Sequence, residues 1–128
     1  MTNEKITQFY EMFNTGDTSN ITSILSPNWK NHPTEAVDKS DVQGFIDNII
    51  LIRNAFDDFK LEIIKTISEE DNVVVHIRMS GIHSKSYAGI EPSHKFVEFY
   101  GIDRHYLVSN QIHDTWHFED YSNLYQNA

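Results

Sequence analysis

Large apolar side chains recur at helical spacing near the start of the chain. Four of them follow one another at i, i+3, i+4 and i+7, the spacing of one helix face: Ile6, Phe9, Tyr10 and Phe13. Gly16 then ends this first helix, since glycine readily adopts the left-handed conformation after a last turn. Thr18 or Ser19 can cap a second, short helix, which Pro27 ends.

A longer helix is predicted from about Asp41 to Phe56. Residues 40–43 (SDVQ) form a capping-box pattern, and apolar residues then follow at spacings of four, three and four: Phe45, Ile49, Ile52 and Phe56. Before this helix, residues 28–33 (NWKNHP) are expected to be extended, because the residue before a proline is disfavoured in helices. This extended segment brings Trp29 and His32 close together.

After Asp58 the apolar period changes from helical to alternating. Phe59, Leu61 and Ile63 alternate with polar residues, which predicts a strand that the polar turn at 69–72 closes. A second strand runs from Asn72 to His83 and forms a hairpin with the first. Residues 84–93, with a glycine and a proline, are expected to form a loop.

The two last predicted strands lie within residues 96–120 and are joined at Ser109-Asn110. A regular two-residue hairpin there pairs Leu107 with Ile112 and Asp103 with Trp116. Alternation then predicts one drier face, made of Val97, Phe99, Gly101, Asp103, His105, Leu107, Ile112, Asp114, Trp116, Phe118 and Asp120. The opposite face of the second strand receives Thr115, His117 and Glu119.

Helices come first along the chain and strands later, which predicts an α+β fold in a single domain of residues 1–128. We expect an antiparallel sheet of about four strands, with helices covering one of its faces. A strongly bent sheet over one long helix would leave a cavity between them, where a small molecule could bind.

Composition narrows the function. The formal net charge of −9 opposes binding to nucleic acid or to an anionic membrane, and we expect neither as a partner. There is no cysteine, no membrane-length apolar run and no signal-peptide pattern at the N-terminus, so we expect a cytoplasmic protein. The seven histidines lack the spacing of known metal motifs, and there is no phosphate-binding glycine loop or Gly-x-Ser-x-Gly motif, so we expect no metal and no cofactor.

Three segments together resemble a known family: FYEMFNTGD (9–17), WKNHP (29–33) and GIHSKSYAGIEPSHKFVEFYGIDRHYLVSNQIHDTW (81–116). Their order and spacing are similar to the SnoaL-like polyketide cyclases, the ester-cyclase branch of the nuclear transport factor 2-like superfamily. The shared pattern falls on Asn14 to Asp17, Trp29 to His32, Gly81 to His83, Gly89 to Pro92, Gly101 to Asp103, and Trp116. The resemblance implies a cone-shaped curved antiparallel sheet wrapped on about three N-terminal helices, a cystatin-like fold with an internal apolar pocket and frequent dimerisation through the exposed sheet face.

In that family an acid/base pair on the last two long strands removes a proton from an activated carbon. The resemblance places the pair on Asp103 and His117, although an aspartate is usual at the second position. A regular hairpin turns His117 to the outer face, whereas a β-bulge would turn it inward to join Asp103. The regular hairpin is favoured because Leu107 opposite Ile112 and Asp103 opposite Trp116 give one consistent dry face.

The candidate site therefore has Asp103 as general base or acid, with a structural ion pair as the alternative. His32 would orient a substrate oxygen, or would simply be a loop histidine bonded to the backbone. Expected pocket-lining residues are Trp29, His83, Phe99, His105, Asp114, Trp116 and Phe118.

Two functions follow from this site. The first is a cofactor-free cyclase or isomerase that transfers a proton on a small apolar carbonyl compound. The alternative is a non-catalytic module that binds a small hydrophobic molecule, and the two differ in whether two polar groups converge in the cavity. A dimerisation scaffold with a filled cavity is a third class.

The outer face of the predicted sheet combines apolar and charged residues. It presents Val74, Tyr100, Ile102 and Tyr106, so we expect a homodimer.

Overall fold

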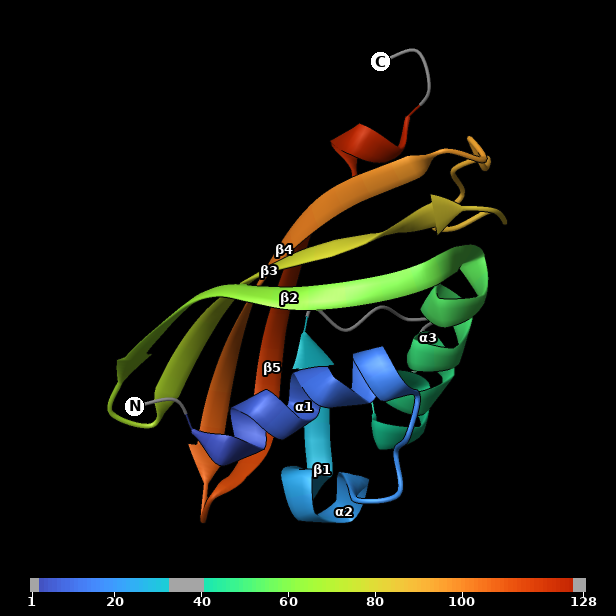
Figure 1. The fold of residues 1–128 in the computed structure, drawn as a ribbon. Helices are drawn as coiled ribbons and strands as arrows, with labels where there is room; N and C mark the ends of the chain where they lie inside the picture. Colours follow the sequence, from blue (N-terminus) through green and yellow to red (C-terminus); the bar gives the residue numbers. More distant parts are fainter. Residues whose placement is uncertain (1–2, 33–40, 126–128) are drawn as a thin grey trace.

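The computed structural model describes residues 3–32 and 41–125, which form three α-helices, five strands and one short 3₁₀ helix (Figure 1). The helices are α1 (Glu4–Thr15), α2 (Ile21–Ile24) and α3 (Val42–Ala55), and the 3₁₀ helix η1 covers Ser122–Leu124. The strands are β1 (Leu25–His32), β2 (Phe56–Glu69), β3 (Asn72–His83), β4 (Phe96–Val108) and β5 (Gln111–Asp120). The predicted α+β class is confirmed.

The strands form one curved sheet in the order β1-β5-β4-β3-β2. Neighbouring strands are antiparallel except at one edge, where β1 runs parallel to β5. Strand β1 contains residues 28–32 of the segment that was expected only to be extended, whose Pro33 lies outside the described residues, and it adds a fifth strand to the four that alternation predicts. The helices lie within the curve of the sheet (Figure 1), so its concave face carries the core.

Helix α1 forms where the apolar spacing predicts it. Its buried face contains Ile6, Phe9, Tyr10, Met12 and Phe13. The helix ends at Gly16, whose φ of 75° is left-handed and whose N–H donates to the Met12 carbonyl at 2.9 Å. The Asn14 side chain, just before this end, bonds both the N–H and the carbonyl of Leu61, at 2.7 and 2.9 Å. Asn14 therefore fixes the end of α1 against β2.

Helix α3 begins after Asp41, whose carboxylate accepts from the Gly44 N–H at 3.0 Å. Ser40 of the predicted capping box lies outside the described residues. The helix ends at Ala55, and Phe56, predicted as its last residue, begins β2 instead. Near the end of α3, Arg53 Nη1 donates to the carbonyls of Phe13 and Asn14, both at 2.8 Å, which ties the two helices together.

The β4–β5 hairpin has the predicted turn but not the predicted register. Ser109 and Asn110 have φ of 51° and 62°, and Leu107 pairs with Ile112. Tyr106, however, pairs with Asp114, so His113 is an extra residue in β5. One extra residue moves every later side chain to the other face of the strand.

The pairing predicted between Asp103 and Trp116 is therefore wrong, because Asp103 pairs with His117 and Arg104 pairs with Trp116. The preference for a regular hairpin was wrong for the same reason. Three side chains of β5 that were assigned to the outer face point to the core or the cavity beside it: Thr115, His117 and Glu119.

Candidate functional site

A cavity of about 450 Å³ lies between α3 and the concave face of the sheet. Its lining comes from β1, α3, the loop after β3, the end of β5 and the segment that follows: Trp29, Asn31, Gly44, Phe45, Asp47, Asn48, Leu51, Tyr87, His117, Glu119 and Tyr121. A smaller void of about 40 Å³ extends toward Tyr10 and Asp103. The volume of the larger cavity lies within the range of about 300–1,000 Å³ that is usual for small-molecule sites.

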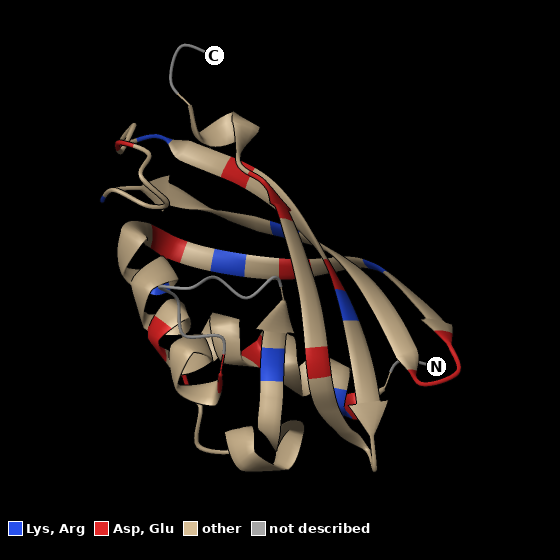
Figure 2. Cartoon of the chain, turned by 180° about the vertical axis from the view of Figure 1, so that it is seen from behind, with Lys and Arg blue, Asp and Glu red and all other residues tan. Residues whose placement is uncertain are grey.

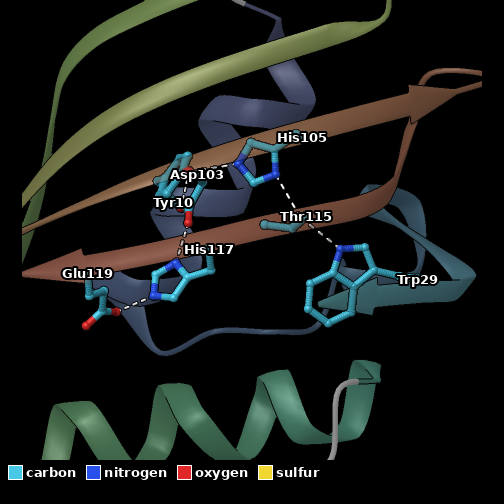
Figure 3. Close-up of polar contacts among 7 residues, drawn as sticks. All are labelled: Tyr10, Trp29, Asp103, His105, Thr115, His117 and Glu119. Carbon is cyan, nitrogen blue, oxygen red and sulfur yellow. Dashed lines mark hydrogen bonds and ion pairs between the residues drawn. The ribbon is translucent and has the colours of Figure 1, made fainter. Parts of the chain in front are cut away.

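His117 lies in the wall of this cavity between two acidic side chains (Figure 3). Its Nδ1 bonds Asp103 Oδ1 and its Nε2 bonds Glu119 Oε1. Both carboxylates are buried, with side-chain exposures of 3% for Asp103 and 8% for Glu119. Burial alone would lower the pKa of His117, but the hydrogen bonds and charges of the two carboxylates raise it to about 10. His117 is thus an imidazolium cation at neutral pH.

Asp103 carries the negative charge behind His117. Its Oδ2 accepts from the Tyr10 hydroxyl at 2.5 Å, so both oxygens are bonded. Burial would raise the pKa of Asp103, but the hydrogen bond from His117 and the nearby positive charge lower it overall. Burial and the Asp103 charge also raise the Tyr10 pKa well above its ordinary value. Tyr10 therefore stays protonated and donates a hydrogen bond to Asp103.

A chain of hydrogen bonds leads from Trp29 to Asp103 (Figure 3). Trp29 Nε1 bonds Thr115 Oγ1 at 3.0 Å, Thr115 Oγ1 bonds His105 Nδ1 at 2.8 Å, and His105 Nε2 bonds the Tyr10 hydroxyl at 2.7 Å. Burial lowers the His105 pKa to about 4, so its ring is neutral and carries one N–H.

The direction of these bonds follows from Asp103, because an ionised carboxylate can only accept. Tyr10 donates its one hydroxyl hydrogen to Asp103, so it must accept from His105 Nε2–H. Nδ1 of the neutral ring then carries no hydrogen and accepts from the Thr115 hydroxyl, whose oxygen accepts from the Trp29 N–H. Four successive donors thus end on one carboxylate, which stabilises its charged form.

The structure brings together some of the predicted site residues. Asp103 and His117 form a bonded pair, Trp29 lines the cavity, and His105 lies directly behind Tyr10. Phe99 lies in the core against Phe56, with ring centroids 5.1 Å apart.

His83 also lies away from the cavity. It is fully buried at the end of β3 and stacks on Phe56 at 4.8 Å.

Four predicted residues instead lie on the outer face of the sheet: His32, Asp114, Trp116 and Phe118. His32 stacks on Trp116 with centroids 4.7 Å apart, and its Nε2 bonds Asp114 Oδ1 at 3.0 Å. The Phe118 side chain is exposed. The placement of these residues in the pocket was wrong for two reasons. The bulge at His113 moves the later side chains of β5 to the opposite face of the sheet. In β1, Trp29 and His32 are three positions apart and therefore face opposite sides.

Sequence reasoning missed four polar residues of the site: Tyr10, Asn31, Thr115 and Glu119. Tyr10 was counted only as part of an apolar helix face, and the two β5 residues were assigned to the wrong side. The family resemblance was the one signal that pointed to this part of β5, because it singled out His117, the residue after Trp116.

Residues 3–32 and 41–125 contain neither a cluster of metal ligands nor a membrane-spanning helix. No group of three or more His, Asp or Glu side chains there has an arrangement that could hold a metal ion. In the same residues no helix is both long and apolar enough to cross a membrane.

A curved sheet that encloses helices and a cavity defines the nuclear transport factor 2-like class of α+β domains. Within that class, the model of the SnoaL-like polyketide cyclase family matches residues 4–128, so the chain belongs to this family. No curated protein matches the sequence significantly.

Solved structures share the fold at low sequence identity. TsrD from Streptomyces laurentii superposes with a TM-score of 0.83 at 18% identity, over 97% of this chain and 94% of that one. IdmH from Streptomyces antibioticus gives 0.80 at 19%, over 94% and 93%. A SnoaL-like polyketide cyclase from Agrobacterium tumefaciens gives 0.80 at 11%, over 96% and 95%. At these identities the likeness establishes the fold and not the activity.

Proposed function

We propose that the protein is a cofactor-free enzyme that transfers a proton on the carbon beside a carbonyl group of a small molecule, as in ring closure or isomerisation. The observation that carries this proposal is the position of His117, a charged imidazolium in the cavity wall between two buried carboxylates. The convergence of an acid and a base in one cavity supports proton transfer over the binding of an inert hydrophobic ligand.

His117 and Glu119 are the two charged groups of this cluster that border the larger cavity. Removing a proton beside a carbonyl group places negative charge on the carbonyl oxygen. We assign His117 Nε2–H as the acid that stabilises this oxygen. Glu119 Oε1, released when the substrate oxygen replaces it on Nε2–H, is the acceptor of the carbon-bound proton.

Asp103 acts through His117 in this proposal. Its carboxylate holds Nδ1, keeps the ring charged and fixes its orientation, while Tyr10 occupies its other oxygen. Asp103 is thus a positioning residue, in place of the direct base predicted from the sequence.

Deuterium exchange tests the proposal. The incorporation of deuterium from D₂O into 2-tetralone and 2-indanone, followed by proton NMR, reports removal of a proton beside the carbonyl. We expect the wild-type protein to accelerate exchange, and His117→Gln or Glu119→Gln to lower the rate by about 100-fold or more. Glu98→Gln makes the same change of charge on the exposed outer face and should leave the rate unchanged. Exchange no faster than in buffer, or equal rates in all three variants, would contradict the proposal.

A further inference from the structure

The second oxygen of Glu119, Oε2, takes no part in the bond to His117. It is buried and accepts no hydrogen bond of normal geometry from the described residues, although the Tyr121 hydroxyl lies close enough for Glu119 to raise the Tyr121 pKa. Asn31 Oδ1, across the same cavity, is also buried, and none of the described residues donates a hydrogen bond to it. A buried acceptor with no donor is costly, and here two such acceptors border one cavity. What they lack is a ligand that presents hydrogen-bond donors.

The charge of the cavity wall is the second observation. The charged side chains that line it are Asp47, His117 and Glu119, and no Lys or Arg is among the described lining residues. The single positive charge, on His117, is already bonded by Glu119 and by Asp103 behind it. Figure 2 shows acidic positions on α3 and β5, two elements that border the cavity. The wall is therefore net negative, which favours a cation and opposes an anion.

Aromatic rings supply the remaining surface. Trp29 and Phe45 meet edge to face on one side at 5.3 Å, and Tyr87 and Tyr121 meet in the same way at 5.9 Å. Ring faces attract organic cations as well as apolar groups. Burial, with the charge of Glu119, raises the pKa of both tyrosines, so their hydroxyls stay protonated and neutral.

We propose that the cavity selects a small planar molecule that carries a protonated amine, with the ammonium group on Glu119 Oε2 and the planar part between the aromatic side chains. This inference names the substrate class of the proposed function and rests on the same cavity. A substrate of this class would carry its carbonyl group toward His117 and its ammonium group toward the oxygen of Glu119 that the proton transfer does not use.

Three probes of similar shape test the proposal: 2-naphthylmethylamine, 2-naphthylmethanol and 2-naphthoic acid, titrated at pH 7 by calorimetry. They present a cation, a neutral donor and an anion on the same ring system. We expect the amine to bind at least about tenfold more tightly than the alcohol, since a charge-assisted hydrogen bond is about twice as strong as a neutral one. The carboxylate should bind most weakly.

Glu119→Gln keeps the shape of the side chain and removes its charge, so the amine should fall to the affinity of the alcohol. Glu98→Gln is the matched control and should leave the order of affinities unchanged. Equal affinity for amine and alcohol, tightest binding of the carboxylate, no amine binding up to millimolar concentration, or an unchanged preference in Glu119→Gln would each overturn the proposal. If Glu119→Gln does not fold, the order of the affinities of the three probes for the wild-type protein tests the proposal.

The proton transfer and the substrate class can be refuted independently, because this experiment measures binding and the exchange assay measures turnover. Amine selectivity without deuterium exchange would refute only the proton transfer. Exchange without amine selectivity would refute only the substrate class.

Discussion

His117 lies directly opposite Asp103 across the β4–β5 ladder and bonds to it, because His113 adds one residue to β5 between the turn and the site. The same residue turns Trp116 outward, where the Arg104 guanidinium lies 4.0 Å from its ring centroid. A single bulge thus decides which of two neighbouring side chains, Trp116 or His117, faces the cavity.

Stability should depend on pH in opposite directions on the two sides of about pH 6.5. The folded pKa of His117 is about 10, above the ordinary value of about 6.5, so the stability that its bonds contribute is present below pH 6.5 and is lost as pH rises toward 10. The His105 pKa of about 4 lies below the ordinary value, so stability falls as pH drops from 6.5 toward 4.

Melting temperatures measured from pH 4 to 9.5 check this dependence. The wild-type protein should be most stable near neutral pH, and His117→Gln should lose the decline on the alkaline side while it keeps the acid one. A variant with the same alkaline decline as the wild-type protein would show that His117 does not cause it.

The donor chain behind Asp103 should contribute to stability. Thr115→Val keeps the shape of the side chain but leaves the buried Trp29 N–H and His105 Nδ1 without their partner. We expect a loss of about 1–3 kcal/mol in the free energy of unfolding, measured by urea denaturation. The same substitution at Thr66, half-buried on β2, should cost less, and equal losses at both sites would argue against the chain.

Alanine substitutions at two glycines with the same backbone conformation separate the cost of backbone strain from the cost of steric crowding. Gly16 and Gly89 have φ of +75° and +76°, but a Cβ would meet Arg53 Nε at 2.9 Å at Gly16 and nothing within 4 Å at Gly89. Gly89→Ala should cost about 1 kcal/mol from strain alone. Gly16→Ala should cost more in urea denaturation, because Arg53 must also move. A smaller loss at Gly16 than at Gly89 would contradict the role given to the contact between α1 and α3.

We propose a homodimer through the outer face of the sheet. Three large side chains are exposed there, with Ile102 45%, Tyr106 37% and Phe118 62% accessible. Light scattering should give twice the chain mass at micromolar concentration, and Phe118→Asp should give the monomer mass. A monomer mass for the wild-type protein would refute the dimer.

Much of the fold could be predicted from the sequence, because helix periodicity and turn chemistry are local. The apolar face of α1, its end at Gly16 and the Ser109-Asn110 turn are where the pattern placed them. The parallel pairing of β1 with β5 could not be predicted, since it depends on contacts between residues more than 80 positions apart, such as Trp29 and Thr115.

The site was predicted less well than the fold, because its geometry depends on the bulge. Alternation along β5 favours Trp116 inward, and only tertiary contacts oppose it: Thr115 bonds Trp29 and His105 inside, while Asp114 bonds His32 outside. A hydrophobic pattern does not contain these polar contacts. Glu119 was missed for this reason, although it completes the cluster around His117.

The titration of His117 by NMR tests the central claim most directly. Ring signals followed from pH 5 to 11 should give a His117 pKa of about 10 in the wild-type protein, well above the ordinary value. Asp103→Asn and Glu119→Gln should each lower it, because each removes one of the carboxylates that hold the charged ring. A His117 pKa near 6.5, unchanged in both variants, would contradict the placement of an imidazolium between two carboxylates in the cavity.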